Sequence, residues 1–208
     1  MKHLRHSVVA LVGMTALVGA AASSAAASTV ESSATASDLP SAASPTPGKQ
    51  VGVKVTGPGG TYVPKSGGVT PMATWGACGV SSDQWKLVRT FQRVGNAQIS
   101  SGNTRLYCGN YGSSGWGYRH IEEGHSQDFL NLAYEVGSSD WRSMADWMMV
   151  QALGWPAYIV KQGNGNFLYK TQVQIRDSGG TIRDVKYSNV VLNGDTSHDI
   201  ITAFPSSS

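Results

Sequence analysis

The tryptophans of this 208-residue chain are confined to its C-terminal part, since all six lie after Ala73. Residues 28–73 hold six of the eight prolines, many Ser, Thr, Gly and Ala residues, and a single aromatic residue, Tyr62. Such a segment cannot bury enough apolar surface to offset its chain entropy. We therefore expect residues 28–73 to be a linker or pro-segment, in which only Val51–Val55 could pair as a strand. Residues 74–208 have the length of one globular domain.

The N-terminus has the pattern of a secretory signal peptide. Lys2 and Arg5 give a positive n-region, Val8–Ala22 is apolar, and Ala25–Ala27 offers a cleavage site before Ser28. The apolar stretch is too short and too rich in alanine for a stable membrane-spanning helix, and no later run is long enough. Residues 1–27 are therefore predicted to be removed, and the mature protein to be secreted without a membrane partner.

The two cysteines, Cys78 and Cys108, are predicted to form a disulfide. An even number of cysteines in an exported protein favours a structural bridge, and a catalytic thiol would leave the other cysteine unpaired. A bridge across about thirty residues stabilises a fold by a few kcal/mol.

The domain is electrically neutral, which limits its function. Residues 74–208 contain eleven Lys and Arg residues and eleven Asp and Glu residues. A broad duplex-binding surface needs a strongly basic face and is disfavoured. A small pocket for one or two phosphates remains compatible with this balance.

Two segments have helical periodicity. Phe129, Leu132, Ala133 and Val136 share one face, with Ser126 as a plausible N-cap and Gly137 as the end. The second segment has an apolar stripe capped by Ser139 and ended at 154–156: Trp141, Met144, Ala145, Met148 and Ala152. Such a stripe is typical of a core face rather than a ligand site.

Alternating apolar and polar residues predict strands near the C-terminus. Phe167–Ile175 and Thr181–Leu192 flank a turn at 177–180, and a final strand covers Asp199–Phe204. Thr104–Cys108 is predicted to be a further short strand, and Trp85–Val94 fits either a helix or a strand. The sequence therefore predicts an α+β domain, with N-terminal helices packed on a small antiparallel β-sheet meander.

Two of the three histidines outside the leader lie five positions apart, at His120 and His125, in the stretch GWGYRHIEEGHSQDF. Zinc motifs that share one helix face place their histidines four apart. Five positions separate the rings by about 140°, so we expect no metal site and no cofactor. Clustered imidazoles beside Tyr118 and Arg119 favour a functional role over helix capping. The third histidine outside the leader, His198, fits a functional role and a structural role equally well.

The order of these motifs resembles a known superfamily. Tyr118-Arg-His-Ile121 followed by His125, and a terminal Ile201-Thr-Ala-Phe-Pro205, are similar to the Barnase–EndoU–colicin–RelE ribonucleases over residues 115–205. The strong basic charge of many such nucleases is missing here. The resemblance implies a secreted or toxin-type nuclease in which His120, His125 and Thr202 share one pocket. Its partners would be an RNA substrate and a cognate inhibitor or immunity protein.

These residue types suit metal-independent RNA cleavage by 2′-OH attack. Two imidazoles serve as base and acid, Arg119 pairs with phosphate, and Thr202 donates to its oxygens. Glu122 or Glu123 is an alternative base. The residues expected to bind substrate are Tyr118, Thr196, Ser197 and His198. Two other classes stay open: a non-enzymatic exported binding or inhibitor protein, and a cell-wall hydrolase.

Overall fold

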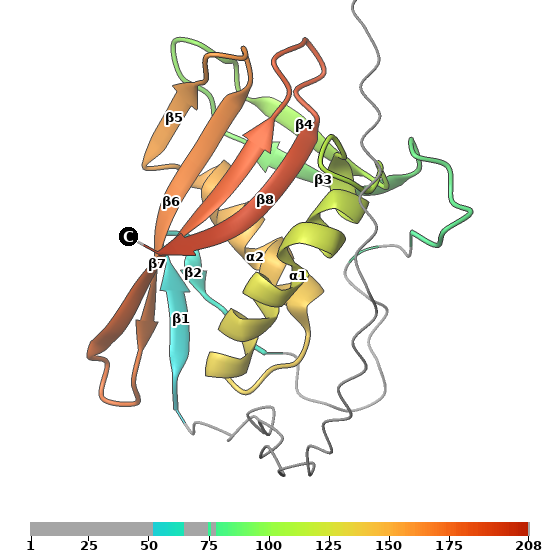
Figure 1. Cartoon of the computed structure of the whole chain (residues 1–208). Helices are drawn as coiled ribbons and strands as arrows, with labels where there is room; N and C mark the ends of the chain where they lie inside the picture. The colour runs from blue at the N-terminus through green and yellow to red at the C-terminus, as the bar shows by residue number, and fades with distance from the viewer. Residues whose placement is uncertain (1–51, 65–74, 76–77, 208) are drawn as a thin grey trace, which may run out of the picture. The chain divides into compact units, whose positions relative to one another are not determined.

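A computed structural model describes residues 52–64, 75 and 78–207, all of which belong to one unit spanning 43–208 (Figure 1). The expected leader at 1–27 lies outside these residues. The described chain forms the strands β1 (Lys54–Gly57), β2 (Gly60–Thr61), β3 (Leu87–Arg93), β4 (Gly102–Tyr107), β5 (Tyr158–Lys161), β6 (Phe167–Arg176), β7 (Ile182–Leu192) and β8 (Ile200–Ser207), and the helices α1 (Gly117–Glu135) and α2 (Trp141–Gly154).

The predicted fold class, with N-terminal helices on a small meander, is wrong. The described chain is mostly β, and both helices lie mid-chain after the four strands β1 to β4. Six strands form one antiparallel sheet in the order β2-β1-β6-β7-β8, with β5 paired to β6, while β3 and β4 form a separate hairpin. The short strand predicted at Thr104–Cys108 is present as β4, but β3 lies in the segment left open between helix and strand, and β1 and β2 lie in the expected linker.

β1 lies within the segment expected to be a linker. Its pairing with β6 aligns Val55 with Ile175, and Val55 is fully buried. The fold therefore includes chain well before residue 74, because β1 pairs with β6 in the large sheet.

The strands predicted near the C-terminus are confirmed: β6 and β7 lie in the middle of the large sheet, and β8 forms one of its edges. Alternate residues of β6 are buried from Phe167 to Ile175, as the period of two requires. On this buried face the hydroxyl of Ser188 in β7 donates to the carbonyl of Met148 in α2 at 2.7 Å. The meander therefore turns one face toward α2.

Both predicted helices are present, but their starts differ from the expectation. α1 begins at Gly117, so Ser126 lies inside the helix and donates its hydroxyl to the Glu122 carbonyl at 2.5 Å. α2 is capped by Asp140, whose carboxylate accepts from the Ser143 N–H at 3.0 Å, rather than by Ser139. Neither helix has the length and apolar character of a membrane-spanning segment.

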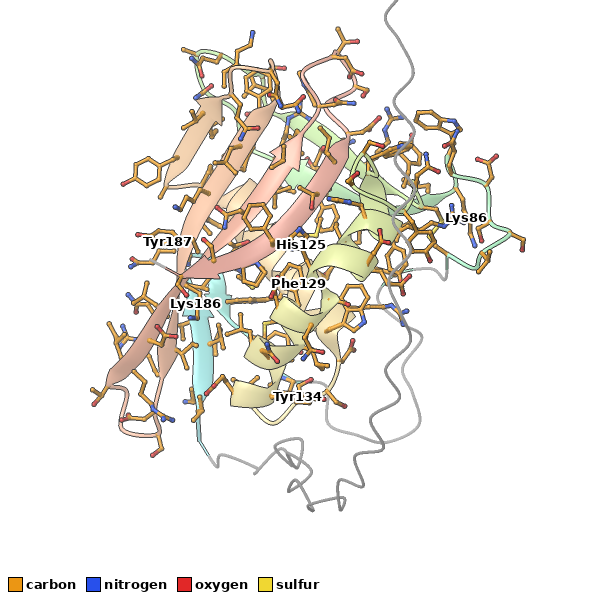
Figure 2. All side chains as sticks on the ribbon, in the orientation of Figure 1. Lys86, His125, Phe129, Tyr134, Lys186 and Tyr187 are labelled. Atoms are coloured by element: carbon orange, nitrogen blue, oxygen red, sulfur yellow. A yellow bond between two sulfur atoms is a disulfide. The ribbon has the colours of Figure 1, made fainter. Side chains whose placement is uncertain are left out.

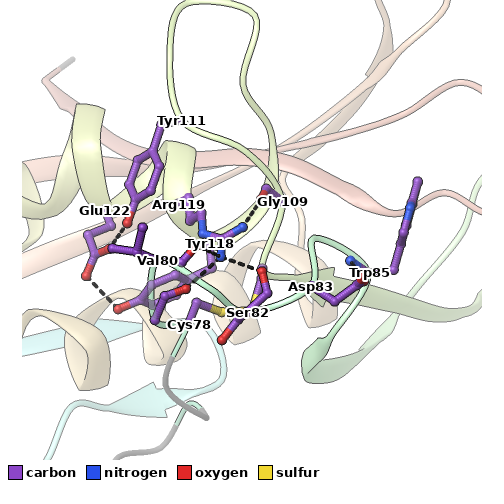
Figure 3. Close-up of a disulfide and its surroundings, with 12 residues drawn as sticks. Cys78, Val80, Ser82, Asp83, Trp85, Gly109, Tyr111, Tyr118, Arg119 and Glu122 are labelled. Atoms are coloured by element: carbon purple, nitrogen blue, oxygen red, sulfur yellow. Dashed lines mark hydrogen bonds between the residues drawn. A yellow bond between two sulfur atoms is a disulfide. The ribbon is translucent and has the colours of Figure 1, made fainter.

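The disulfide between Cys78 and Cys108 is confirmed. It joins the chain before β3 to the residue that follows β4, and both cysteines are buried. The bridge therefore fixes the 78–86 segment next to the start of α1 (Figure 3).

Candidate functional site

The two histidines of α1 are in contact. The ring centroids of His120 and His125 are 5.9 Å apart, with the ring planes at 82°. Their spacing alone predicts rings that diverge by about 140° on a helix. The helix continues through Gly124, so the contact comes from the orientation of the two side chains and not from a break in the helix. The structure thus brings together the two imidazoles that the sequence singled out.

Each ring is anchored through Nδ1, but to a different kind of partner. Nδ1 of His120 lies 3.2 Å from the Gly112 carbonyl oxygen, which can only accept a hydrogen bond. The proton of the neutral ring therefore lies on Nδ1, and Nε2 keeps its lone pair. Nδ1 of His125 lies 3.3 Å from the Asp128 carboxylate, a contact that becomes an ion pair when the ring is protonated.

The loop that supplies Gly112 is fastened to α1 by two carboxylates. Glu123 accepts from the Gly112 N–H at 2.5 Å, and Glu122 accepts from the Tyr111 hydroxyl at 3.2 Å. The two glutamates considered as alternative bases therefore hold the loop that orients His120.

Strand β8 reaches the histidine pair from the sheet. The Phe204 ring stacks on His125, with centroids 5.2 Å apart and planes at 30°. Figure 2 shows His125 where α1 and β8 meet. The first half of β8 contains a bulge, because Thr202 pairs with Val191 while Ile200 pairs with Leu192. Thr202 therefore shares a sheet face with Phe204 but not with Ile200, contrary to strict alternation.

The hydroxyl of Thr202 is buried and has no hydrogen-bond partner among the described residues. Thr202 lies two positions before Phe204, about 7 Å along the strand. His120 precedes His125 by five helical positions, about 7.5 Å. α1 and β8 run in nearly the same direction (Figure 1), so we expect His120 to lie toward the Thr202 end of the strand.

Arg119 does not face the histidine pair. Its side chain is buried, and its terminal nitrogens donate to the carbonyl oxygens of Gly109, Gly79 and Ser82, each at 2.7 Å. A guanidinium committed to these carbonyls cannot also hold a phosphate. The arginine expected to bind phosphate instead clamps the 79–82 segment to α1 (Figure 3).

Tyr118 is also buried, in a polar cluster between the two helices. Its hydroxyl donates to Glu122 at 2.8 Å and accepts from Nε of Arg142 at 2.7 Å. Burial, and then the hydrogen bond to Glu122, raises the pKa of Tyr118 well above its ordinary value. The tyrosine expected to bind substrate is therefore neutral and joins α1 to α2.

The β7–β8 loop carries the remaining expected residues at a separate position. Ser197 donates to Asp195 at 2.6 Å, and Thr196 is exposed. His198 has a φ of 49°, and its ring packs on Phe167 with centroids 5.6 Å apart. Its carbonyl oxygen accepts a hydrogen bond from the Thr104 hydroxyl, and its Nδ1 lies 3.3 Å from the Asn193 carbonyl oxygen. The structure therefore separates this group from the histidine pair.

Sequence reasoning missed Phe204 and Asp128 as parts of the site. Phe204 lies inside the terminal motif that was noted only for Thr202. Asp128 stands three positions after His125, a helical spacing that places two side chains on neighbouring turns and was available from the sequence.

The described residues contain no group of three or more His, Cys, Asp or Glu side chains arranged to hold a metal ion. Comparison with protein-family models, with characterised proteins and with solved structures found no match to this chain. The site geometry is therefore the basis for a functional proposal.

Proposed function

We propose that this protein is a secreted, metal-independent endoribonuclease that cleaves RNA by attack of the 2′-OH on the adjacent phosphate. One observation carries the proposal: two half-buried imidazoles lie in contact, one bonded to a carbonyl and the other to a carboxylate. Phosphodiester transfer needs a base and an acid at opposite sides of one phosphorus, and histidine serves both roles near neutral pH.

The hydrogen-bond partners of the two rings suggest which histidine is the base and which is the acid. Nε2 of His120 carries the lone pair in the neutral ring and accepts the 2′-OH proton as the 2′-oxygen bonds to phosphorus. His125, paired with Asp128 when protonated, gives its Nε2 proton to the leaving 5′-oxygen as that bond breaks. The products are a 2′,3′-cyclic phosphate and a free 5′-OH. The buried Thr202 hydroxyl gains a partner when it donates to a phosphate oxygen.

We also propose that the enzyme acts outside the cell that produces it. Export and the structural disulfide fit a nuclease that acts outside the producing cell, as in secreted toxins. A cell that makes such an enzyme would need a cognate inhibitor or immunity protein to protect its own RNA.

The test is digestion of total RNA by the purified full chain in excess chelator. We expect degradation between about pH 5 and 8, the range in which histidines titrate. Both His120→Ala and His125→Ala should reduce cleavage at least a hundredfold. Oligonucleotides with 2′-O-methyl groups should stay intact, because they lack the nucleophile.

His198→Asn is the matched control, because asparagine tolerates the positive φ of this position and His198 lies apart from the pair. It should keep full activity. Intact RNA across the pH range, or equal activity in all three histidine variants, would overturn the proposal.

A further inference from the structure

A cluster of three aromatic rings includes Trp116, the residue at the N-cap of α1. The rings of Trp85 and Trp116 have centroids 4.8 Å apart, and Tyr107 lies edge-on to both at 5.9 and 6.2 Å. Trp85 is 59% exposed, although burying a tryptophan is strongly favourable. An exposed aromatic ring held in a cluster offers a flat face to a ligand.

This face opens onto a cavity of about 340 Å³, which is in the range of small-molecule sites, roughly 300–1,000 Å³. Trp85 and Trp116 form one side, and Ile200 and Ile201 of β8 form another. Ser114 and Gly115 also line the cavity. The cavity therefore accommodates one planar ring with its attached sugar.

The cavity adjoins the candidate catalytic site through two shared elements. The 110–116 loop lines the cavity with Ser114, Gly115 and Trp116, and the same loop orients His120 through Gly112. On β8, Ile201 lines the cavity and Thr202 follows directly. A chain that crosses the histidine pair would therefore place its next unit at the cavity.

An ion pair between Arg105 and Asp199 lies at the rim. Arg105 donates Nε–H to Asp199, which lines the cavity, at 3.0 Å, and its guanidinium lies 5.3 Å from the centre of the Tyr107 ring. The Arg105 side chain is 44% exposed, so its charge reaches solvent beside the aromatic face. Aromatic rings beside a cation are the elements with which proteins hold single-stranded nucleic acid.

We propose that the cavity between Trp85, Trp116 and Ile201 binds a nucleobase of single-stranded RNA next to the scissile phosphate. The inference rests on the proposed ribonuclease function and assigns that enzyme a subsite. The base stacks on the exposed Trp85 ring while Arg105 attracts the flanking phosphate. Because every base has a π-face and the walls are largely apolar, binding tolerates all four bases.

The test measures binding separately from cleavage. The probe is a fluorescein-labelled 2′-O-methyl RNA of mixed sequence, about eight nucleotides long, followed by anisotropy. This probe cannot be cut by 2′-OH attack. We expect Trp85→Ala to weaken binding about tenfold or more, and Trp85→Phe to recover most of the loss. His120→Ala should bind within about threefold of wild type while losing cleavage.

Trp155→Ala is the matched control, because Trp155 is a comparably exposed tryptophan that lines other cavities near β1 and β5. Its affinity should equal that of wild type. Unchanged binding by Trp85→Ala, or no binding of the probe by wild type, overturns the subsite even if RNA is cleaved. Binding that depends on Trp85 without any cleavage retains the subsite and overturns the ribonuclease. Binding of cell-wall oligosaccharides in place of the probe also overturns the subsite.

Discussion

The ring of Phe204 lies on the ring of His125, with centroids 5.2 Å apart and planes inclined by 30°. Phe204 belongs to β8 and His125 to α1, so the contact fixes the orientation of the proposed acid relative to the sheet. Phe204→Leu keeps an apolar side chain but removes the stacking surface. We expect RNA cleavage to fall about tenfold, because a freer imidazole spends less time in the reactive orientation.

The free energy of unfolding of this variant should decrease by about 1 kcal/mol, measured by denaturant titration. Phe167→Leu is the control, since Phe167 also packs on a histidine, His198, edge-on with ring centroids 5.6 Å apart. It should lose stability but not activity. Equal activity loss in both variants would show that the effect is general destabilisation.

The periodicity of apolar residues in the sequence predicted those helices and strands that bury one regular face. The meander from Phe167 onward alternates over many residues, and α1 and α2 carry clear apolar stripes, so these were located correctly. β1 and β5 are four residues long, too short for a period to be recognised, and both pair with β6, whose other edge is occupied by β7. Tertiary pairing, rather than local sequence, determines such strands.

The candidate site was predicted only in part, because some of its contacts depend on tertiary structure. The proximity of His120 and His125 follows from their sequence spacing, but their contact depends on side-chain orientation. Arg119 was misassigned because an arginine beside two histidines suggests phosphate binding. Its actual partners are carbonyl oxygens up to 40 positions earlier in the chain, which no local pattern reveals.

Arg119→Lys tests the clamp between α1 and the 79–82 segment. Lysine keeps the charge but lacks the planar fork that serves several carbonyls at once. We expect the free energy of unfolding to fall by about 2–3 kcal/mol, since buried carbonyls lose charged donors. Cleavage, assayed well below the melting temperature, should stay within about threefold of wild type. A hundredfold loss of cleavage with unchanged stability would instead indicate direct phosphate binding.

Gly124 lies inside helix α1 and Gly137 lies just after its end, so alanine substitutions at the two positions can be compared. A Cβ added at either position meets no atom within 4 Å, but only Gly137 has a positive φ, of 72°. Gly124→Ala should stabilise the protein by about 1 kcal/mol, because alanine has the higher helix propensity. Gly137→Ala should destabilise it by about 1 kcal/mol through backbone strain. Thermal unfolding of both variants measures the difference, and shifts of equal sign would contradict the assignment.

The buried Tyr118 predicts a loss of stability at alkaline pH. Burial raises its pKa in the folded state above the ordinary value of 10.0, which the unfolded chain retains. The folded state therefore holds its proton longer, and this contribution is fully present below pH 10 and is lost as pH rises through the folded pKa.

Unfolding measured from about pH 8 to 11 should show stability that declines above pH 10. Tyr118→Phe should flatten this decline, although the variant loses hydrogen bonds at neutral pH. A smaller decline should persist, because burial also raises the pKa of Tyr169. An identical alkaline decline in wild type and variant would show that other groups cause it.

Thr202→Val separates the catalytic and structural roles of the one hydroxyl that connects β8 to the proposed chemistry. Valine has nearly the same shape, so packing around this position is conserved. The wild-type hydroxyl is buried without a partner among the described residues, and such a group costs about 1–3 kcal/mol. The variant should therefore be as stable as wild type or more stable, by up to about 1 kcal/mol. RNA cleavage should nevertheless fall at least tenfold, because the phosphate loses a donor.

Thr171→Val is its counterpart, because the Thr171 hydroxyl is buried too but donates to the Trp155 carbonyl at 2.8 Å. This variant should lose about 1–2 kcal/mol of stability and keep its activity. Stability changes of opposite sign for the two threonines, together with a loss of cleavage in Thr202→Val alone, would show that an unsatisfied hydroxyl is retained at β8 for substrate. If Thr202→Val is destabilised and fully active, the hydroxyl is structural and the role proposed for it in phosphate binding is wrong.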